Sequence, residues 1–369
     1  MSSPQASKRL VVKVGSAVLA DQGGLSIASV ERLARDIGRV RHAGWEVVLV
    51  SSGAIASGFR ALGLAKPPKA IRQKQAAAAI GQQRLMAAYA QAFAESGTTV
   101  AQVLLTADDF DHRLRFLNAR RTLETLLEHR VLPIINENDS VSFAEIKLGD
   151  NDRLAALTSA MLRADSLVML STAPGLWASG TRKVIPVVES IDAARTHVRA
   201  EKSGVGTGGM TTKLDAAEIV TTLGIECVIA PGSTESVLER VLAGESIGTR
   251  FIAQRSRIDS RRRWIGLSAR ARGTIEIDAG AARALAARGA SLLPSGITDV
   301  SGDFDTGSVV EIVHQGTTIA RGLTAYAAAE IRQIRGLRAS QIAERLGYTH
   351  CDEVVHRDDL LLTPQGRSR

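Results

Sequence analysis

The sequence is poor in cysteine and aromatic residues, which excludes several kinds of fold and site. Only Cys227 and Cys351 occur among 369 residues, too few for a disulfide framework, a cysteine-based zinc site or an iron–sulfur site. Aromatic side chains make up 4% of the chain, so alanine, leucine and valine must supply most of the apolar core. We therefore expect an aliphatic core without cross-links.

Long apolar runs are also missing. No run approaches the ~20 residues that a membrane-spanning helix needs. Residues 1–9 lack the apolar segment of a secretory signal and are interpreted as a disordered tail, as are residues 363–369. A cytoplasmic protein without a membrane association is the expectation.

The chain is long enough for two or three domains, at roughly 150 residues each. Residues 250–272 hold eight arginines against a single acid, Asp259. Within this stretch we assign residues 255–262 to a basic linker between a domain at 10–254 and a second at 263–362. A basic segment also attracts nucleic acid or another polyanion, so RNA stays open as the weaker alternative.

The first domain is predicted to be α/β. Apolar runs indicate strands, and residues spaced by three and four indicate helices. Strands that alternate with helices form a mainly parallel sheet covered on both faces. The expected strands are residues 10–14, 46–50, 98–105, 131–135, 167–170 and 226–230, and the expected helices are residues 29–43, 75–95, 118–129 and those that follow Asp152 and Lys213.

The second domain is predicted to be small and mostly β. Its apolar runs are short, and turn-forming residues separate them. The expected turns are residues 278–280, 294–296, 301–303 and 305–307.

Residues 131–153 have the strongest functional signal. The apolar run that ends at Ile135 is followed by Asn136-Glu-Asn-Asp139, and a second polar cluster, Gly149-Asp-Asn-Asp152, directly precedes a helical pattern. A turn between the clusters would gather carboxylates and amides at the carboxyl edge of a strand, where open α/β sheets bind ligands. The alternative is a pair of ordinary loops, because Asn, Asp and Gly dominate turns.

Two lysines and two glycine segments add to this signal. Lys13 lies inside an apolar strand, where burying an unpaired charge is costly, so it either reaches solvent at an edge or enters a site. The strand at 46–50 runs into Ser51-Ser-Gly53 and a helix, a weak motif for anions. Residues 204–213 form a glycine-rich loop that opens a helix and ends in Lys213. This favours phosphate binding through backbone amides over a plain surface loop.

Taken together and in order, these motifs resemble the amino acid kinase family, and within it the members that phosphorylate glutamate. The resemblance covers essentially the whole chain, because residues 291–297 and 355–359 are similar to a PUA domain. The motifs are Lys13-Val-Gly15, Ser51-Ser-Gly-Ala-Ile55, Asn136-Glu-Asn-Asp139, Gly149-Asp-Asn-Asp152 and Gly206-Thr-Gly-Gly-Met-Thr-Thr-Lys213.

The resemblance implies a three-layer αβα kinase domain that uses ATP and Mg²⁺ to phosphorylate the side-chain carboxylate of L-glutamate, which begins proline biosynthesis. It also implies inhibition by proline and a homo-oligomer, either a dimer or a tetramer. Lys13 and Lys213 would stabilise the transferred phosphoryl group, and Asp152 would orient both lysines. No residue is assigned as a metal ligand.

The resemblance also assigns binding roles. Ser52, Asp139 and Asn151 would hold glutamate, with Asp150 and Gly53 beside them. The nucleotide phosphates would meet Lys13, Gly15, Gly53 and the loop, and the remaining nucleotide candidates are Ser171, Thr172, Thr207, Gly208, Gly209, Met210, Thr211, Thr212 and Lys213.

One segment departs from the family pattern. After its strand near residue 170 the family has Thr or Ser followed by Asp, then Gly-Leu-Tyr and soon Asp-Pro. This chain has Ser171-Thr172, then Gly175-Leu-Trp177, and no Asp-Pro follows. A missing acid and a shorter loop predict altered nucleotide affinity and specificity.

Two rival functions remain open at this stage. One is an amino acid kinase that acts on aspartate, acetylglutamate or carbamate, against which the Asn136–Asp139 cluster and the PUA-like tail argue. The other is an RNA-binding protein on an inactive kinase scaffold. The joint presence of Lys13, Asp152 and Lys213 argues against the second.

Overall fold

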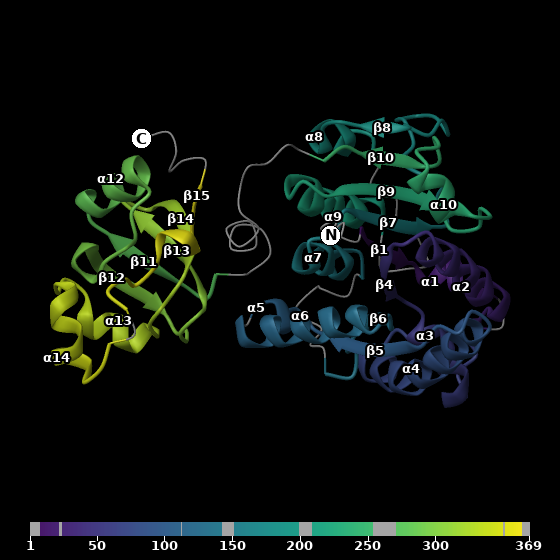
Figure 1. Ribbon diagram of the computed structural model, residues 1–369, viewed down its shortest axis with the longest axis horizontal. Helices are drawn as coiled ribbons and strands as arrows, with labels where there is room; N and C mark the ends of the chain where they lie inside the picture. Colours follow the sequence, from purple (N-terminus) through teal and green to yellow (C-terminus); the bar gives the residue numbers. More distant parts are fainter. Residues whose placement is uncertain are drawn as a thin grey trace, which may run out of the picture. The chain divides into compact units, whose positions relative to one another are not determined.

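The structure is a computed structural model that describes residues 8–21, 24–111, 113–141, 151–198, 209–253, 271–349 and 351–363. The described residues form two compact units, which are treated separately (Figure 1). One unit contains an eight-stranded sheet and the other a five-stranded sheet. The predicted linker at 255–262 lies outside the described residues.

The described part of the larger unit is built on a mainly parallel sheet, in the order β5-β6-β4-β1-β7-β9-β10-β8. The strands from β5 to β9 in this order are parallel, and β10 runs antiparallel to β9. The strands are β1 (Arg9–Val14), β4 (Glu46–Ser51), β5 (Val100–Leu105), β6 (Leu132–Glu137), β7 (Ser166–Ser171), β8 (Val187–Val188), β9 (Glu226–Pro231) and β10 (Thr249–Phe251), with β2 (Ala20–Asp21) and β3 (Gly24–Leu25) as a separate pair.

The helices of this unit cover both faces of the sheet (Figure 1). They are α1 (Ser16–Leu19), α2 (Ile27–His42), α3 (Ala54–Gly58), α4 (Ile71–Ala94), the part of α6 (Arg113–Glu128) that begins at Ala119, α7 (Asn151–Leu162), α8 (Ile191–Arg195), α9 (Met210–Thr222) and α10 (Val237–Leu242), with the 3₁₀ turn η1 (Phe59–Leu62). Residues 108–118, which comprise most of α5 (Ala107–Asp111) and the start of α6, belong to the smaller unit. Strands alternating with helices therefore give the three-layer αβα arrangement that was expected.

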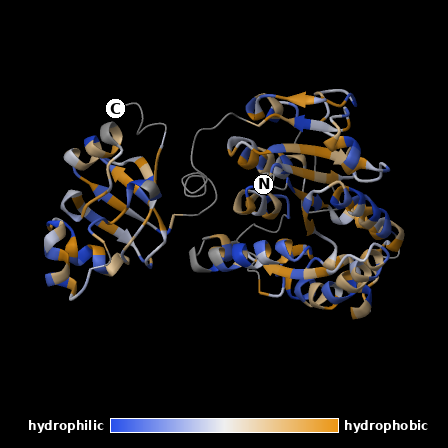
Figure 2. Cartoon of the chain, in the orientation of Figure 1, coloured by the Kyte–Doolittle hydropathy of each residue, from blue (hydrophilic) through white to orange (hydrophobic). Residues whose placement is uncertain are grey.

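In strand β1, side chains alternate between the two faces of the sheet, and this alternation places Lys13 on one face and the apolar residues on the other. Its residues Leu10, Val12 and Val14 join a buried cluster with α2, α4 and α10. Successive side chains of a strand point to opposite faces, so Lys13 points to the other face, where α7 and α9 pack beside each other. Figure 2 shows the hydrophobic colouring concentrated on the sheet.

Helices α3 and α4 approach each other unusually closely, and two glycines allow it. A Cβ on Gly58 would lie 1.9 Å from the Ala77 carbonyl oxygen, and a Cβ on Gly81 would lie 1.7 Å from that of Ala54. Side chains at either position would force the helices apart. The crossing therefore fixes the start of α3, which directly follows Ser52 and Gly53.

The smaller unit has its own sheet, in the order β12-β11-β13-β14-β15 among the described residues, and its own buried cluster. Its elements are β11 (Gly273–Ile277), α12 (Ala279–Arg288), η2 (Pro294–Gly296), β12 (Ile297–Gly302), β13 (Val309–His314), β14 (Thr317–Leu323), α13 (Ala328–Ile334), η3 (Ala339–Gln341), α14 (Ile342–Leu346), η4 (Arg357–Asp359) and β15 (Leu360–Leu362).

Three expectations are corrected at the level of local structure. The predicted turn at 278–280 is the start of α12, because Asp278 is its N-cap and accepts a hydrogen bond from Ala281 N. Asp152 lies in the first turn of α7 rather than before it. Arg9, assigned to the tail, opens β1, where its side chain bonds Glu46.

None of the helices in the described part of the chain has the length and apolar character needed to span a membrane.

Candidate active site

The carboxyl ends of four parallel strands meet at one edge of the larger sheet. Val14 of β1 is level with Ser51 of β4 and Leu170 of β7, and Val50 is level with Ile135 of β6. The polar residues that follow these strands are therefore neighbours in space. This edge carries the candidate site, as the sequence predicted.

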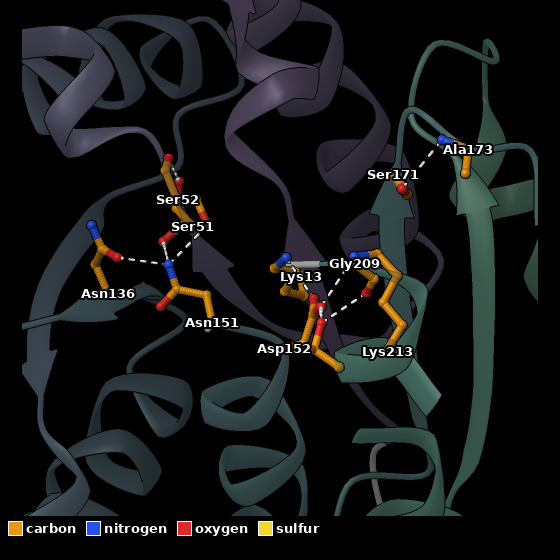
Figure 3. A network of polar contacts seen from close by, with 11 residues as sticks. Lys13, Ser51, Ser52, Asn136, Asn151, Asp152, Ser171, Ala173, Gly209 and Lys213 are labelled. Atoms are coloured by element: carbon orange, nitrogen blue, oxygen red, sulfur yellow. Dashed lines mark hydrogen bonds and ion pairs between the residues drawn. The ribbon is translucent and has the colours of Figure 1, made fainter. Parts of the chain in front are cut away.

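Asp152 joins two lysines that are far apart in the sequence. Its Oδ1 lies 2.5 Å from Lys13 Nζ, and its Oδ2 lies 3.0 Å from Lys213 Nζ. All three side chains are buried. Thr212 adds a hydroxyl that donates to Asp152 Oδ2 at 2.9 Å. The arrangement expected of Lys13, Asp152 and Lys213 is thus present (Figure 3).

The electrostatics of this trio favour a charged Asp152. Burial alone would raise the pKa of Asp152, but the positive charges and hydrogen bonds of Lys13 and Lys213 outweigh it, so the pKa falls below its ordinary value. The start of helix α7 also favours a negative charge at this position. Two ammonium groups are thereby held at fixed positions inside the protein, ready to face a further anion.

A cluster of amides lies beside the trio, on the other side of Asn151. Asn151 Nδ2 donates to the Ser51 carbonyl at 3.1 Å, to Ser52 Oγ at 2.8 Å and to Asn136 Oδ1 at 3.1 Å. Asn151 and Asp152 are consecutive in the first turn of α7, so the start of this helix positions one residue of the amide cluster and one of the lysine trio (Figure 3). The two polar clusters of residues 131–153 do meet.

Two residues of this cluster, Gln82 and Tyr89, were missed from the sequence. Gln82 Oε1 accepts a hydrogen bond from Asn136 Nδ2 at 2.8 Å, and Tyr89 OH bonds Ser51 Oγ at 2.8 Å. Burial raises the pKa of the Tyr89 hydroxyl, and the hydrogen bond between Tyr89 and Ser51 acts in the opposite direction. The sequence did contain one signal for Gln82: it lies on the face of α4 whose other residues pack into the core.

Asp139 follows β6 and lies in the turn beyond Asn136. Its pKa is raised to about 6, chiefly by burial and also by the charge of Glu137, while Lys74 acts in the opposite direction. A carboxylate with this pKa is ionised at neutral pH and can bind a cation such as an ammonium group. It loses that ability in mild acid.

The three glycines proposed to lie near the ligands differ in backbone conformation and in surroundings. The Gly15 amide donates to the Leu170 carbonyl at 3.2 Å, and a Cβ on Gly15 would lie 3.9 Å from Lys13 Nζ. Gly53 has a φ of 109°, a conformation that glycine adopts at no steric cost. Gly209 is the N-cap of α9, and no atom of the described residues outside its own neighbourhood lies within 4 Å of its Cβ position.

The nucleotide candidates around these glycines are also placed. Met210, Thr211 and Thr212 form the first turn of α9, with Thr211 exposed. Ser171 ends β7, and its Oγ accepts from Ala173 N at 3.2 Å (Figure 3). Thr172 is exposed, and Trp177 is 38% exposed. Asp150, Thr207 and Gly208 lie outside the described residues.

The described residues of the site do not form a binding site for a resident magnesium ion. Among the residues that the structure describes, His, Cys, Asp and Glu side chains form no group of three suited to a metal. Both oxygens of Asp152 already face lysines. Mg²⁺ prefers oxygen ligands and often binds through the phosphates of a substrate. The described side chains do not supply such a set of oxygen ligands on their own.

The comparisons with known protein families identify the class of this protein as a kinase. The model of the amino acid kinase family matches residues 8–231, and the PUA domain model matches residues 273–346. The chain belongs to the amino acid kinase family, and a kinase of this family takes ATP as its co-substrate.

The similar curated proteins narrow the comparison further. A protein of Syntrophus aciditrophicus named "Glutamate 5-kinase" is 45% identical, over 98% of this chain and 95% of its own length. Proteins of the same name from Syntrophotalea carbinolica and Thermus thermophilus are both 46% identical, over 96% of this chain and 97% of theirs. The similarity therefore extends through both units.

Solved structures are also similar. Carbamate kinase from Giardia lamblia bound to AMP-PNP matches with a TM-score of 0.48 and 20% identity, over 68% of this chain and 99% of its own.

Proposed function

We propose that the protein transfers the γ-phosphoryl group of ATP to the side-chain carboxylate of L-glutamate, giving L-glutamyl 5-phosphate, the first product of proline biosynthesis. The observation that carries this proposal is the buried Lys13–Asp152–Lys213 trio next to the amide cluster of Asn151. The names of the 45–46% identical relatives support the choice of glutamate as the acceptor.

The chemistry explains why such a trio is useful. A carboxylate that attacks a γ-phosphate brings two anions together, so the protein must position them and neutralise charge on the moving group. Lys13 from β1 and Lys213 from α9 supply two cations, and Asp152 keeps both in place. No general base is needed, because the carboxylate is already ionised near neutral pH.

The binding roles follow from the two halves of the site. Ser52, Gly53 and Asn151 would hold glutamate, with Asp139 against its ammonium group and Asp150 nearby. The nucleotide would lie along Gly15, Ser171, Thr172 and the start of α9. The loop and helix residues proposed to contact it are residues 207–213. Mg²⁺ would enter on the phosphates of ATP.

The remaining parts of the proposal concern organisation and regulation. Residues 10–254 form the kinase domain and residues 263–362 the PUA-like domain, joined by a basic linker at 255–262. The enzyme works in the cytoplasm as a homo-oligomer, and proline inhibits it. The separate buried clusters of the two units support the division into domains.

Release of ADP tests the proposal. ATP turnover should depend on L-glutamate and not on aspartate, acetylglutamate or carbamate, and added proline should lower it. Hydroxylamine should trap the acyl phosphate product. Turnover that prefers another acid would overturn the choice of substrate, whereas RNA retention at moderate salt without turnover would favour an RNA-binding protein.

A further inference from the structure

Gln82 is a polar side chain in a core position. It lies on α4 among the buried residues Ala78, Leu85, Tyr89 and Phe93, and it is only 9% exposed. Burying an amide without its hydrogen bonds is costly, so a glutamine here needs a physical reason. Its neighbour Gln83 on the same helix is exposed and has no such constraint.

The hydrogen bonds determine which atom of Gln82 is unpaired. The Glu137 backbone N–H can only donate, and it donates to Asn136 Oδ1 at 2.9 Å. Asn136 Nδ2 is therefore the donor toward Gln82, whose Oε1 accepts at 2.8 Å. This leaves Gln82 Nε2, which is buried and has no hydrogen-bond partner among the described residues.

The other end of the cluster is oriented in the same way. The Ser51 backbone carbonyl can only accept, and it accepts from Asn151 Nδ2. Asn151 Oδ1 is consequently the unpaired atom, and it too is buried without a partner among the described residues. The cluster thus keeps one unpaired donor, on Gln82, and one unpaired acceptor, on Asn151, at its two ends.

We propose that Gln82 Nε2 donates a hydrogen bond to the α-carboxylate of the acceptor amino acid. The proposal rests on the proposed function. A donor complements a carboxylate, whereas Asn151 Oδ1 complements an ammonium group. The side-chain carboxylate must react beside Lys13 and Lys213, so the α-carboxylate belongs at the amide end of the site. Gln82 then contributes to specificity for an α-amino acid.

Gln82→Glu provides a sharp test with full-length protein. A glutamate at this position can still accept the hydrogen bond from Asn136, but it offers no amide donor and adds a negative charge. We expect the KM for L-glutamate to rise at least about tenfold, as for the loss of a hydrogen bond to a charged group, with the KM for ATP unchanged. Gln83→Glu, on the same helix, should match the wild type. A KM in Gln82→Glu within twofold of wild type would overturn the proposal.

Gln82→Met provides a second, uncharged variant. With 4-aminobutyrate, which lacks the α-carboxylate, its kcat/KM should stay within twofold of wild type, while kcat/KM for L-glutamate falls at least about tenfold. An equal loss with both acids would assign Gln82 a structural role only and overturn the proposal. A wild-type enzyme that does not turn over L-glutamate would overturn the proposed function as well, so the two failures are distinguishable.

Discussion

Asn151 Nδ2 donates to Asn136 Oδ1 across 3.1 Å, although the two residues are 15 positions apart and belong to different elements. Asn136 lies near the end of β6, and Asn151 opens α7. The bond ties the start of the helix to the edge of the sheet. Because Asp152 follows Asn151 directly, the same bond also sets the position of the carboxylate that holds both lysines.

Lys213→Ala should lower kcat far more than it weakens glutamate binding. Lys213 Nζ is buried against Asp152 at the start of α9, where it can meet charge that develops on the phosphoryl group. Losing one such electrostatic contact typically costs on the order of 10²–10³ in rate. Steady-state kinetics with the exposed Lys183→Ala as a control measures this. An unchanged kcat would remove Lys213 from the catalytic set.

Asp139→Ala should mainly raise the KM for L-glutamate, because the substrate ammonium loses its counter-charge in both the ground and transition states. The rise should be roughly 10- to 100-fold, the equivalent of a hydrogen bond between charged groups. Asp192→Ala, an exposed acid on α8, serves as the control. A fall in kcat at constant KM would mean that Asp139 does not bind the substrate.

The KM for L-glutamate should also depend on pH, because the pKa of Asp139 is raised to about 6. The ionised form is the one that binds an ammonium group, and a falling pH protonates it. The KM for L-glutamate should therefore be constant above pH 7 and rise below pH 6, by about tenfold per pH unit. Asp139→Asn should show a high KM that does not change between pH 5 and 8. The same acid limb in that variant would assign the effect to another group.

Thr172 and Trp177 should control nucleotide affinity. Thr172 is exposed at the end of β7, and its hydroxyl carries no charge where the family has aspartate. Hydrogen bonds to charged groups contribute ~1.5–3 kcal/mol against ~1 for neutral ones, so we expect a high KM for ATP and weak discrimination against GTP. Thr172→Asp should lower the KM for ATP. Trp177→Ala should raise it, since the partly exposed ring can stack on the base.

Steady-state KM values for ATP and GTP in the wild type and both variants check this account. The competing idea is that the shortened loop lies away from the nucleotide. That idea holds if neither substitution changes the KM for ATP beyond error.

Residues 1–262 should form an active kinase without the remainder of the chain. The described site residues all lie before residue 214, and the two units have separate buried clusters. ATP turnover by the truncated chain, assayed in parallel with the full-length protein, shows whether the kinase activity is independent of residues 263–369. An insoluble or inactive product would contradict it.

Gly81→Ala should destabilise the larger unit. The new Cβ would lie 1.7 Å from the Ala54 carbonyl oxygen, and overpacking of this kind typically costs about 1–3 kcal/mol in free energy of unfolding. The KM for L-glutamate should rise too, because α3 begins next to Ser52 and Gly53. In Gly38→Ala the nearest atom is 3.9 Å away, so this helical control should gain ~0.5–1 kcal/mol. Equal free energies of unfolding of the two variants, measured in urea, would contradict this explanation of the helix crossing.

The predicted helices and strands agree best with the structure where hydrophobic periodicity is strong. Val30, Leu33, Ile37 and Val40 share one helical face, and all four are buried in α2. At Asp278 the prediction was wrong, because Asp and Gly were read as turn formers. The alanines that follow have the highest helix propensity, and Asp is also a favoured N-cap, so the local information was sufficient for a helix.

The sequence by itself determined the order of strands and helices, the sheet edge that carries the site and the family resemblance. These depend on spacing and residue type within short segments. Only the tertiary structure decided that Lys13 and Lys213 share the two oxygens of Asp152, since this requires β1 to lie between β4 and β7 and α7 to pack beside α9. It also decided the surroundings of Gln82: a lone glutamine in a helical pattern is indistinguishable from a surface residue until its burial and its bond to Asn136 are known.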